Sequence, residues 1–173
     1  MRADVVVLAV GNRSRGDDAL GPVLLGRLGP WLRSEGIADR FELIEDYQLQ
    51  IEHALDLQGR SLALFVDAGS GTPAPFTLER IGASERGAAH LTHALSPQGV
   101  LAVFERAVGG PPPAAFVLCV RGERFELGEP ISVAAARHLQ SAWTLLRSLC
   151  RRAEPQAWAR AGARPHPQAP RRA

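Results

Sequence analysis

Apolar and polar positions divide the first 150 residues into segments that alternate between two patterns. Runs of apolar residues at 5–10, 61–68 and 114–120 are typical of strands buried on both faces of a parallel sheet. The segment 41–46, FELIED, predicts a further strand between them. Residues 75–81 alternate apolar and polar side chains, which favours an edge strand.

The segments between these strands have helical patterns. Gly29 and Pro30 are expected to break or kink the first helix, and Ser132 is a suitable N-cap for the last. The predicted helices span residues 22–28, 50–57, 96–108 and 132–149. Strands that alternate with helices predict an α/β protein with a three-layer α/β/α sandwich. We expect about five strands, mostly parallel, with one antiparallel edge strand, in a single domain of residues 1–150.

The last 23 residues have a different composition. Residues 151–173 are rich in Arg, Pro and Ala and have no periodic apolar face, so we predict a disordered tail. Most of the excess positive charge, in a chain of formal net charge +2, lies there. A solvated extension is the simplest interpretation, and a segment that binds nucleic acid or an acidic partner is the alternative.

Composition excludes several classes of chemistry. All 20 basic residues are Arg, so Schiff-base catalysis and a phosphate-loop lysine are impossible. Cys119 and Cys150 have no CxxC spacing, which favours reduced thiols in a cytoplasmic protein. No signal peptide and no apolar run near the ~20 residues of a membrane helix is evident.

Ionisable side chains follow the predicted strands. Asp17 and Asp18 come after the first strand, Asp46 ends the second and Asp67 ends the third. His93 precedes the helix that begins near Ser96. In an open α/β sheet, ligands bind outside the carboxyl ends of the strands, so these side chains are candidates for one site.

The loop after the first strand, GNRSRGDDALG, departs from both common nucleotide-binding motifs. Two aspartates stand where a phosphate loop has Lys and Ser or Thr, and the glycine spacing of a dinucleotide fingerprint is absent. At ~4 Å and an effective dielectric constant of ~20, each like-charge pair with a phosphate would cost about 4 kcal/mol. Two carboxylates suit a cation instead. Together with an imidazole they form an O,O,N ligand set that suits nickel, zinc or ferrous iron.

The spacing alone leaves other roles open. Asp17 and Asp18 can both be helix caps, and Asp67 can cap the turn that follows it. Asp46 can turn the chain or hold a ribose, and His93 can be a core histidine, with His90 as a nearby competitor. We expect the other histidines to lie on the surface or in the tail: His53, His138 and His166.

Three motifs together resemble those of the [NiFe]-hydrogenase maturation endopeptidases. They are VVVLAVGNRSRGDDALGP, LALFVDAGSG and THALSPQGVL, in this order. After the second strand this chain has DYQLQ, where many members of that family have D-G/C-G-T. This departure resembles the branch that serves NAD-reducing, bidirectional hydrogenases.

The resemblance implies an endopeptidase that removes the C-terminal extension of the hydrogenase large-subunit precursor after nickel insertion. By motif position, it assigns Asp18, Asp67 and His93 as the catalytic and metal-contacting residues and makes Asp17 a cap. The nickel would arrive with the precursor, so we expect no resident cofactor. We further expect a cytoplasmic monomer that binds neither nucleic acid nor membranes. Two alternatives remain: a non-enzymatic nickel-sensing chaperone, and a nucleotide-binding oxidoreductase domain in which Asp46 holds the ribose.

Overall fold

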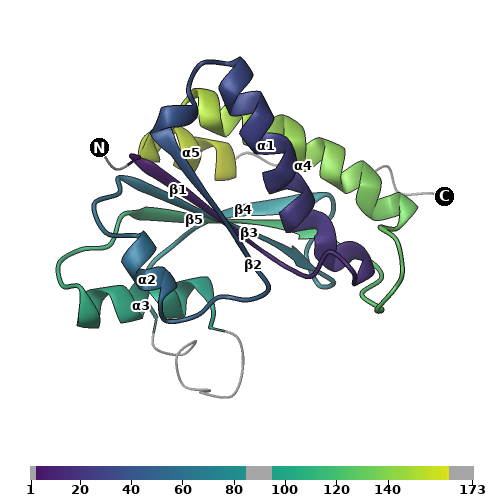
Figure 1. The fold of residues 1–173 in the computed structure, drawn as a ribbon, viewed down its shortest axis with the longest axis horizontal. Coiled ribbons are helices and arrows are strands. Elements are labelled where there is room, and N and C mark those ends of the chain that lie inside the picture. Colours follow the sequence, from purple (N-terminus) through teal and green to yellow (C-terminus); the bar gives the residue numbers. More distant parts are fainter. Residues whose placement is uncertain (1–2, 85–94, 164–173) are drawn as a thin grey trace.

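Five strands form one sheet in the order β2-β1-β3-β5-β4 (Figure 1). The computed structural model describes residues 3–84 and 95–163. Four strands are parallel, and the edge strand β4 is antiparallel to β5. The strands are β1 (Val5–Val10), β2 (Phe41–Asp46), β3 (Leu62–Gly69), β4 (Phe76–Ile81) and β5 (Ala114–Arg121). The predicted number of strands, their direction and the antiparallel edge are therefore confirmed.

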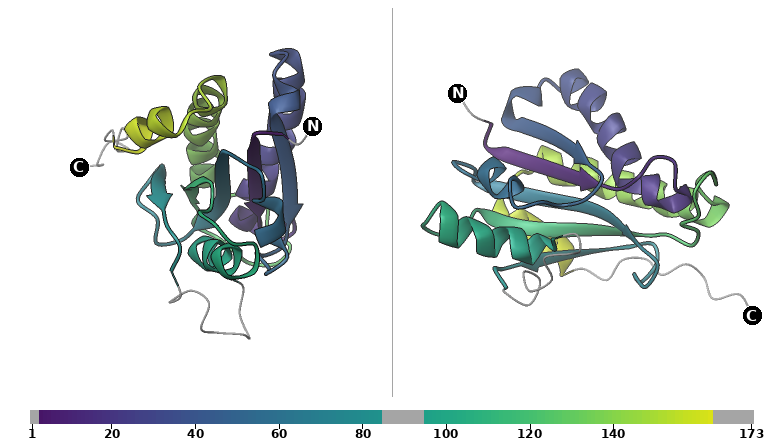
Figure 2. Two further views of the ribbon diagram at one scale, coloured as in Figure 1. Left: turned by 90° about the vertical axis from the view of Figure 1, so that its left-hand side faces the viewer. Right: turned by 60° about the horizontal axis from the view of Figure 1, so that its bottom comes forward.

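Helices cover both faces of this sheet, as the two further views show (Figure 2). One face carries α1 (Leu20–Ser34), α4 (Val133–Arg151) and α5 (Pro155–Gly162), and the other carries α2 (His53–Asp56) and α3 (Pro97–Ala107). Two short 3-10 helices, η1 (Gly16–Ala19) and η2 (Ala38–Arg40), complete the fold. Within the described residues, no helix is both long and apolar enough to span a bilayer.

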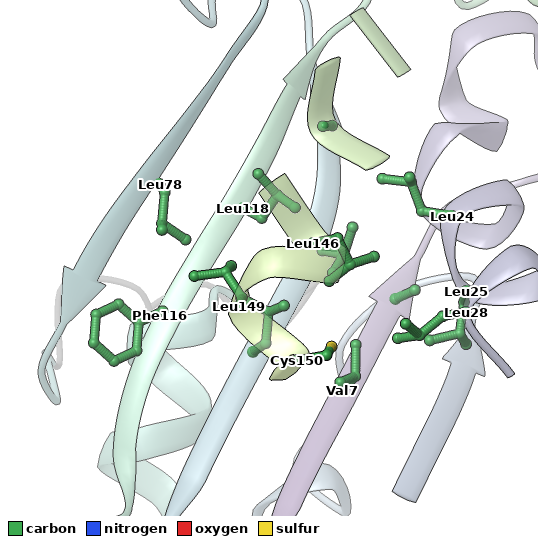
Figure 3. Close-up of a cluster of buried hydrophobic side chains, with 14 of the residues drawn as sticks. Val7, Leu24, Leu25, Leu28, Leu78, Phe116, Leu118, Leu146, Leu149 and Cys150 are labelled. Carbon is green, nitrogen blue, oxygen red and sulfur yellow. The ribbon is translucent and has the colours of Figure 1, made fainter. Parts of the chain in front are cut away.

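Successive residues of the central strands belong to two separate cores. In β1, Val5 and Val7 pack with α1, α4 and α5, whereas Val6 and Leu8 pack with α2 and α3. Figure 3 shows the first of these cores, with leucines of α1 and α4 pointing onto β1, β5 and β4. Burial on both faces explains why these strands are continuous apolar runs in the sequence.

Helix α5 corrects the prediction of disorder from Arg151 onward. Trp158 is fully buried, its ring lies edge-to-face against Phe116 with centroids 5.5 Å apart, and its Nε1 donates to the Leu149 carbonyl over 2.9 Å. A Cβ on Gly162 would lie 2.6 Å from the Leu78 carbonyl oxygen, so α5 packs directly on the edge strand. The disorder prediction is wrong for residues 151–163, because one buried aromatic anchors the helix. The rest of the predicted tail, residues 164–173, lies outside the described residues.

Helix α1 also differs from the expected element. It runs unbroken through Gly29 and Pro30 to Ser34. Leu28 and Leu32, on either side of the proline, are both buried in the core. This packing outweighs the loss of one backbone hydrogen bond at Pro30.

The strand order places a crevice between β1 and β3. The chain moves from β1 outward to β2 and then returns to β3 on the other side of β1. Such a reversal opens a crevice at the carboxyl ends of the two strands, where ligands of doubly wound sheets bind. The loop carrying Asp18 follows β1, and Asp67 lies near the end of β3.

Candidate active site

Two glycines let the first loop fold tightly over the end of the sheet. Gly11 has a φ of +141°, and a Cβ there would lie 2.0 Å from the Asp18 carbonyl oxygen. A Cβ on Gly21, in the first turn of α1, would lie 2.8 Å from the Val10 carbonyl oxygen and 3.0 Å from that of Val66. Neither position has room for a side chain. Because neither glycine has a side chain, the loop can fold back and place Asp18 next to the end of β1, where the loop begins.

Asp18 lies at this turn, half-buried, in η1. One of its carboxylate oxygens, Oδ2, accepts a hydrogen bond from the Asn12 amide over 2.7 Å. The Asn12 side chain in turn accepts from the Ser14 amide over 2.9 Å, which fixes the loop between them. In the part of the chain that the structure describes, Oδ1 of Asp18 has no hydrogen-bond partner.

Asp67 faces the same crevice from β3. Its Oδ1 accepts from the Ala68 amide over 2.7 Å. The pKa of Asp67 is raised to about 6: burial is the largest cause, the hydrogen bond from the Ala68 amide opposes it, and the negative charge of Asp18 adds to it. The two carboxylates are therefore close enough to repel one another, as the sequence predicted for acids that follow adjacent strands.

A cleft of ≈ 650 Å³ holds both acids. It is bounded by the ends of β1 and β3, the segment after β2, the start of α3 and one residue of the loop between β5 and α4. Its lining consists of Val10, Gly11, Asp18, Tyr47, Gln48, Leu49, Asp67, Ala68, Gly69, Ser70, Leu95, Ser96, Pro97 and Phe125. These walls are mostly apolar, so Asp18 and Asp67 provide the negative charge of the cleft.

His93, the third predicted member of the site, lies outside the described residues, as does its competitor His90. Leu95 and Ser96, which follow His93 in the sequence, line the cleft. Ser96 caps α3 by accepting from the Gly99 amide over 3.1 Å. Among residues 3–84 and 95–163, no three His, Cys, Asp or Glu side chains are grouped closely enough to hold a metal ion. The described part of the chain therefore brings together two of the three predicted site residues, Asp18 and Asp67.

Asp17, predicted to cap the helix, has a different role. Its carboxylate is fully buried and accepts four hydrogen bonds from the loop between β5 and α4. The donors are the amides of Glu123, Arg124 and Ser132, at 2.6–2.9 Å, and the Ser132 hydroxyl at 2.8 Å. Burial alone would raise the pKa of Asp17, but these hydrogen bonds together lower it below its usual value. Asp17 joins two loops and does not cap its own helix.

Comparisons with solved structures identify the fold. No protein-family model and no curated protein matches the chain. The structure is similar to that of the hydrogenase maturating endopeptidase HybD from E. coli, with a TM-score of 0.63 and 23% identity over 88% of this chain and 94% of that chain. It is also similar to that of the [NiFe] hydrogenase maturation protease HycI from Thermococcus kodakarensis, with a TM-score of 0.62 and 19% identity over 87% of this chain and 94% of that chain. For a hydrogenase 2 maturation peptidase from a Thaumarchaeota archaeon, the TM-score is 0.57 and the identity is 21%, over 86% of this chain and 97% of that chain.

The chain has the fold of the hydrogenase maturation proteases. At these identities the likeness extends to the fold and its topology. The α/β/α fold predicted from the alternation of strands and helices is therefore confirmed by an independent comparison of structures.

Asp46 and His53 form a pair on either side of Tyr47, Gln48 and Leu49, which line the cleft. His53 is only 6% exposed, so its assignment to the surface is wrong. Its Nδ1 accepts from the Gln50 amide over 2.9 Å, and its Nε2 lies 3.5 Å from Oδ2 of Asp46. The other Asp46 oxygen accepts from the Tyr47 amide over 2.6 Å. Asp46 thus turns the chain, one of the two roles that the sequence left open.

Other features of the site had no clear sequence signal. The apolar lining residues Leu49 and Phe125 come from loops without periodicity. A second cavity of ≈ 410 Å³ adjoins Asp67 and contains Cys119, whose Sγ lies 2.9 Å from the Thr72 hydroxyl. Burial raises the pKa of the Cys119 thiol, which opposes a nucleophilic role. The position of Cys119 directly beside Asp67 follows from the β3–β5 register and could have been found by aligning the two strands.

Proposed function

We propose that this protein is an endopeptidase that removes the C-terminal extension of a [NiFe]-hydrogenase large-subunit precursor after nickel insertion. The observation that carries the proposal is the convergence of Asp18 and Asp67 on one cleft in a fold shared with hydrogenase maturation proteases. The DYQLQ segment supports a finer proposal, a precursor of the NAD-reducing class. We place the reaction in the cytoplasm.

Nickel enters this reaction as part of the substrate. Asp18 and Asp67 would contact it from the loop after β1 and from β3, and His93 would contact it from the segment that leads to Leu95. A divalent cation between the two carboxylates would relieve the repulsion that helps to raise the pKa of Asp67. The site would therefore recognise a precursor that carries its metal and ignore one that lacks it.

The substrate chain would occupy the mostly apolar cleft around these acids. The nickel would act as a Lewis acid, either on the scissile carbonyl or on the attacking water. In the rival route, a carboxylate acts as general base on that water without help from the metal. In both routes the site recognises only a precursor that carries nickel, and the routes differ in the group that activates the water.

The test uses the purified full-length protein with a large-subunit precursor, with and without nickel, and follows the mass of the precursor. We expect nickel-loaded precursor to lose its C-terminal extension and nickel-free precursor to keep it. Asp18→Ala, Asp67→Ala and His93→Ala should each slow cleavage by about 100-fold or more, since each removes a metal contact.

Glu123→Gln serves as a control, because Glu123 meets Asp17 through its backbone amide and not through its side chain. It should cleave at the wild-type rate. Normal cleavage by all three alanine variants would overturn the site assignment. Binding of nickel-loaded precursor without any shortening would overturn the enzymatic function and favour a chaperone.

A further inference from the structure

The loop between β2 and α2 is held by a buried histidine that the proposed reaction does not use. Three successive residues of this loop, Tyr47, Gln48 and Leu49, line the cleft. Apart from the buried Leu49, the loop is open to solvent: Tyr47 is 74% exposed, and Ile51 is 60% exposed. His53, at the start of α2, is the buried polar group next to it.

The contacts of His53 fix both the imidazole and the loop. Because Nδ1 accepts the Gln50 amide hydrogen, it carries no proton, so the proton of the neutral ring is on Nε2. That nitrogen faces Oδ2 of Asp46 at 3.5 Å. One side chain therefore contacts both ends of the segment from Asp46 to Gln50.

Residues 46–50 are hydrogen-bonded to two other segments of the chain: the loop that carries Asp18 and the segment at the start of α3. The carbonyl of Asp46 accepts from the Gly11 amide over 3.1 Å, and Gly11 packs on the backbone of Asp18. The carbonyl of the buried Leu49 accepts from the Leu95 amide over 3.2 Å. Leu95 lines the cleft and follows His93 by two residues in the sequence.

We infer that His53 is a positioning residue for the cleft. It holds residues 46–50 in the conformation that sets the spacing between the Gly11–Asp18 loop and the start of α3. This inference rests on the proposed function, because it assumes that metal contacts from the two segments must meet in one geometry. Small errors in such a geometry are costly: a displacement of about 1 Å can reduce a rate by about 100-fold.

The test compares variants that separate the two contacts of His53. His53→Asn keeps an acceptor at the place of Nδ1, His53→Gln moves the polar group toward Asp46, and His53→Phe has neither. Two readouts are needed on the full-length protein: kcat and KM with nickel-loaded precursor, and hydrogen exchange at the Gln50 and Leu95 amides.

We expect His53→Phe to lower kcat by about 10- to 100-fold while KM changes by less than about threefold. Exchange at both amides should become faster, because the Gln50 amide loses its acceptor and the Leu49 carbonyl, which accepts from the Leu95 amide, is no longer held in place. His53→Asn should restore most of the rate and of the protection at Gln50. Glu52→Gln, an exposed neighbour in the same turn, should behave as wild type.

Three results would overturn the inference. His53→Phe could keep a kcat within about twofold of wild type, or its exchange at Leu95 could be unchanged. His53→Asn could fail to restore what His53→Phe loses. If His53→Phe does not fold, His53→Asn and His53→Gln are compared instead. Only His53→Asn keeps the hydrogen bond to the Gln50 amide, so the inference requires it to cleave faster than His53→Gln. If wild-type protein cleaves no precursor, the proposed function fails, whereas the exchange data still decide whether His53 holds the loop.

Discussion

Asp17 and Asp18 are adjacent in the chain, yet their carboxylates lie in opposite surroundings. Asp17 is buried against the loop between β5 and α4 and receives four hydrogen bonds. Asp18 opens into the cleft, has one hydrogen bond from Asn12 and faces the negative charge of Asp67. The pKa of Asp17 is lowered, whereas that of Asp67, on the cleft side, is raised to about 6.

The contrast separates acids that stabilise the fold from acids that are available to a ligand. A buried carboxylate with enough donors stabilises the folded state, because its charge is compensated in place. Two carboxylates that face each other with one donor each destabilise it, and a cation would compensate them. Proteins commonly keep such unfavourable arrangements at functional sites.

The largest effect on stability is expected for Asp17→Asn. The carboxamide must turn its NH₂ group toward at least one of the N–H donors that now bond to Asp17, so buried donors lose their acceptor. We expect a loss of about 3–5 kcal/mol in the free energy of unfolding, measured by urea titration.

This variant also tests the comparison from the side of function. At a temperature where it is folded, Asp17→Asn should still cleave precursor, because Asp17 does not open into the cleft. A decrease of less than about 0.5 kcal/mol in the free energy of unfolding would contradict the role of Asp17 as a structural anchor.

Asp67→Asn should change stability in the opposite direction. The folded-state pKa of about 6 is above the ordinary value of 3.8, so protonated Asp67 favours folding and this contribution is lost as the pH rises toward and through 6. A neutral Asn avoids the loss while its oxygen can still accept from Ala68. The variant should therefore be more stable than wild type by about 2 kcal/mol at pH 8 and not at pH 4.

Unfolding titrations at the two pH values provide the check for Asp67→Asn. A variant that is equally or less stable than wild type at pH 8 would contradict the destabilising charge at the cleft. The same variant should have lost cleavage, which would show that stability and function oppose each other at this residue.

Ser132→Ala should have a smaller effect than Asp17→Asn. It removes the side-chain cap of α4, which accepts from the Ala135 amide, and one of the four donors to Asp17. The other three donors remain, so we expect a loss of about 1–2 kcal/mol by thermal or urea unfolding. A loss as large as that of Asp17→Asn would mean that the hydroxyl is the principal partner of Asp17.

Asp18→Asn should have the smallest effect on stability. The side-chain oxygen can still accept from the Asn12 amide, and the repulsion with Asp67 disappears. We expect the free energy of unfolding to remain within about 0.5 kcal/mol of wild type. A loss of several kcal/mol would place Asp18 with the structural acids and remove the contrast.

Much of the fold could be predicted from the sequence because the pattern of apolar residues in each strand reflects how the strand is buried. The doubly buried β1 and β3 are continuous apolar runs, and the edge strand β4 alternates. The carboxyl ends of parallel strands meet at one edge, so the approach of Asp18 and Asp67 also followed from the sequence. These features depend on residues close together in the chain or on a general rule of topology.

The remaining features depend on contacts between distant residues. Asp17 bonds to residues more than 100 positions away, in a loop with no periodic pattern. Helix α5 lies in a segment whose composition favours disorder, and Trp158 anchors it to the fold through contacts with Phe116 and Leu149. His53 has no local mark that distinguishes a buried histidine from an exposed one.

The claim that Asp18 and Asp67 share one site is tested most directly by the titration of the Asp67 carboxyl, followed by NMR of its carboxyl carbon. We predict a midpoint near pH 6 in wild-type protein. The midpoint should fall in Asp18→Asn, because one of its two causes is gone, and should fall further in wild type when a diamagnetic divalent cation such as zinc is added. A wild-type midpoint near the ordinary value of 3.8, unaffected by Asp18→Asn and by the cation, would contradict the account.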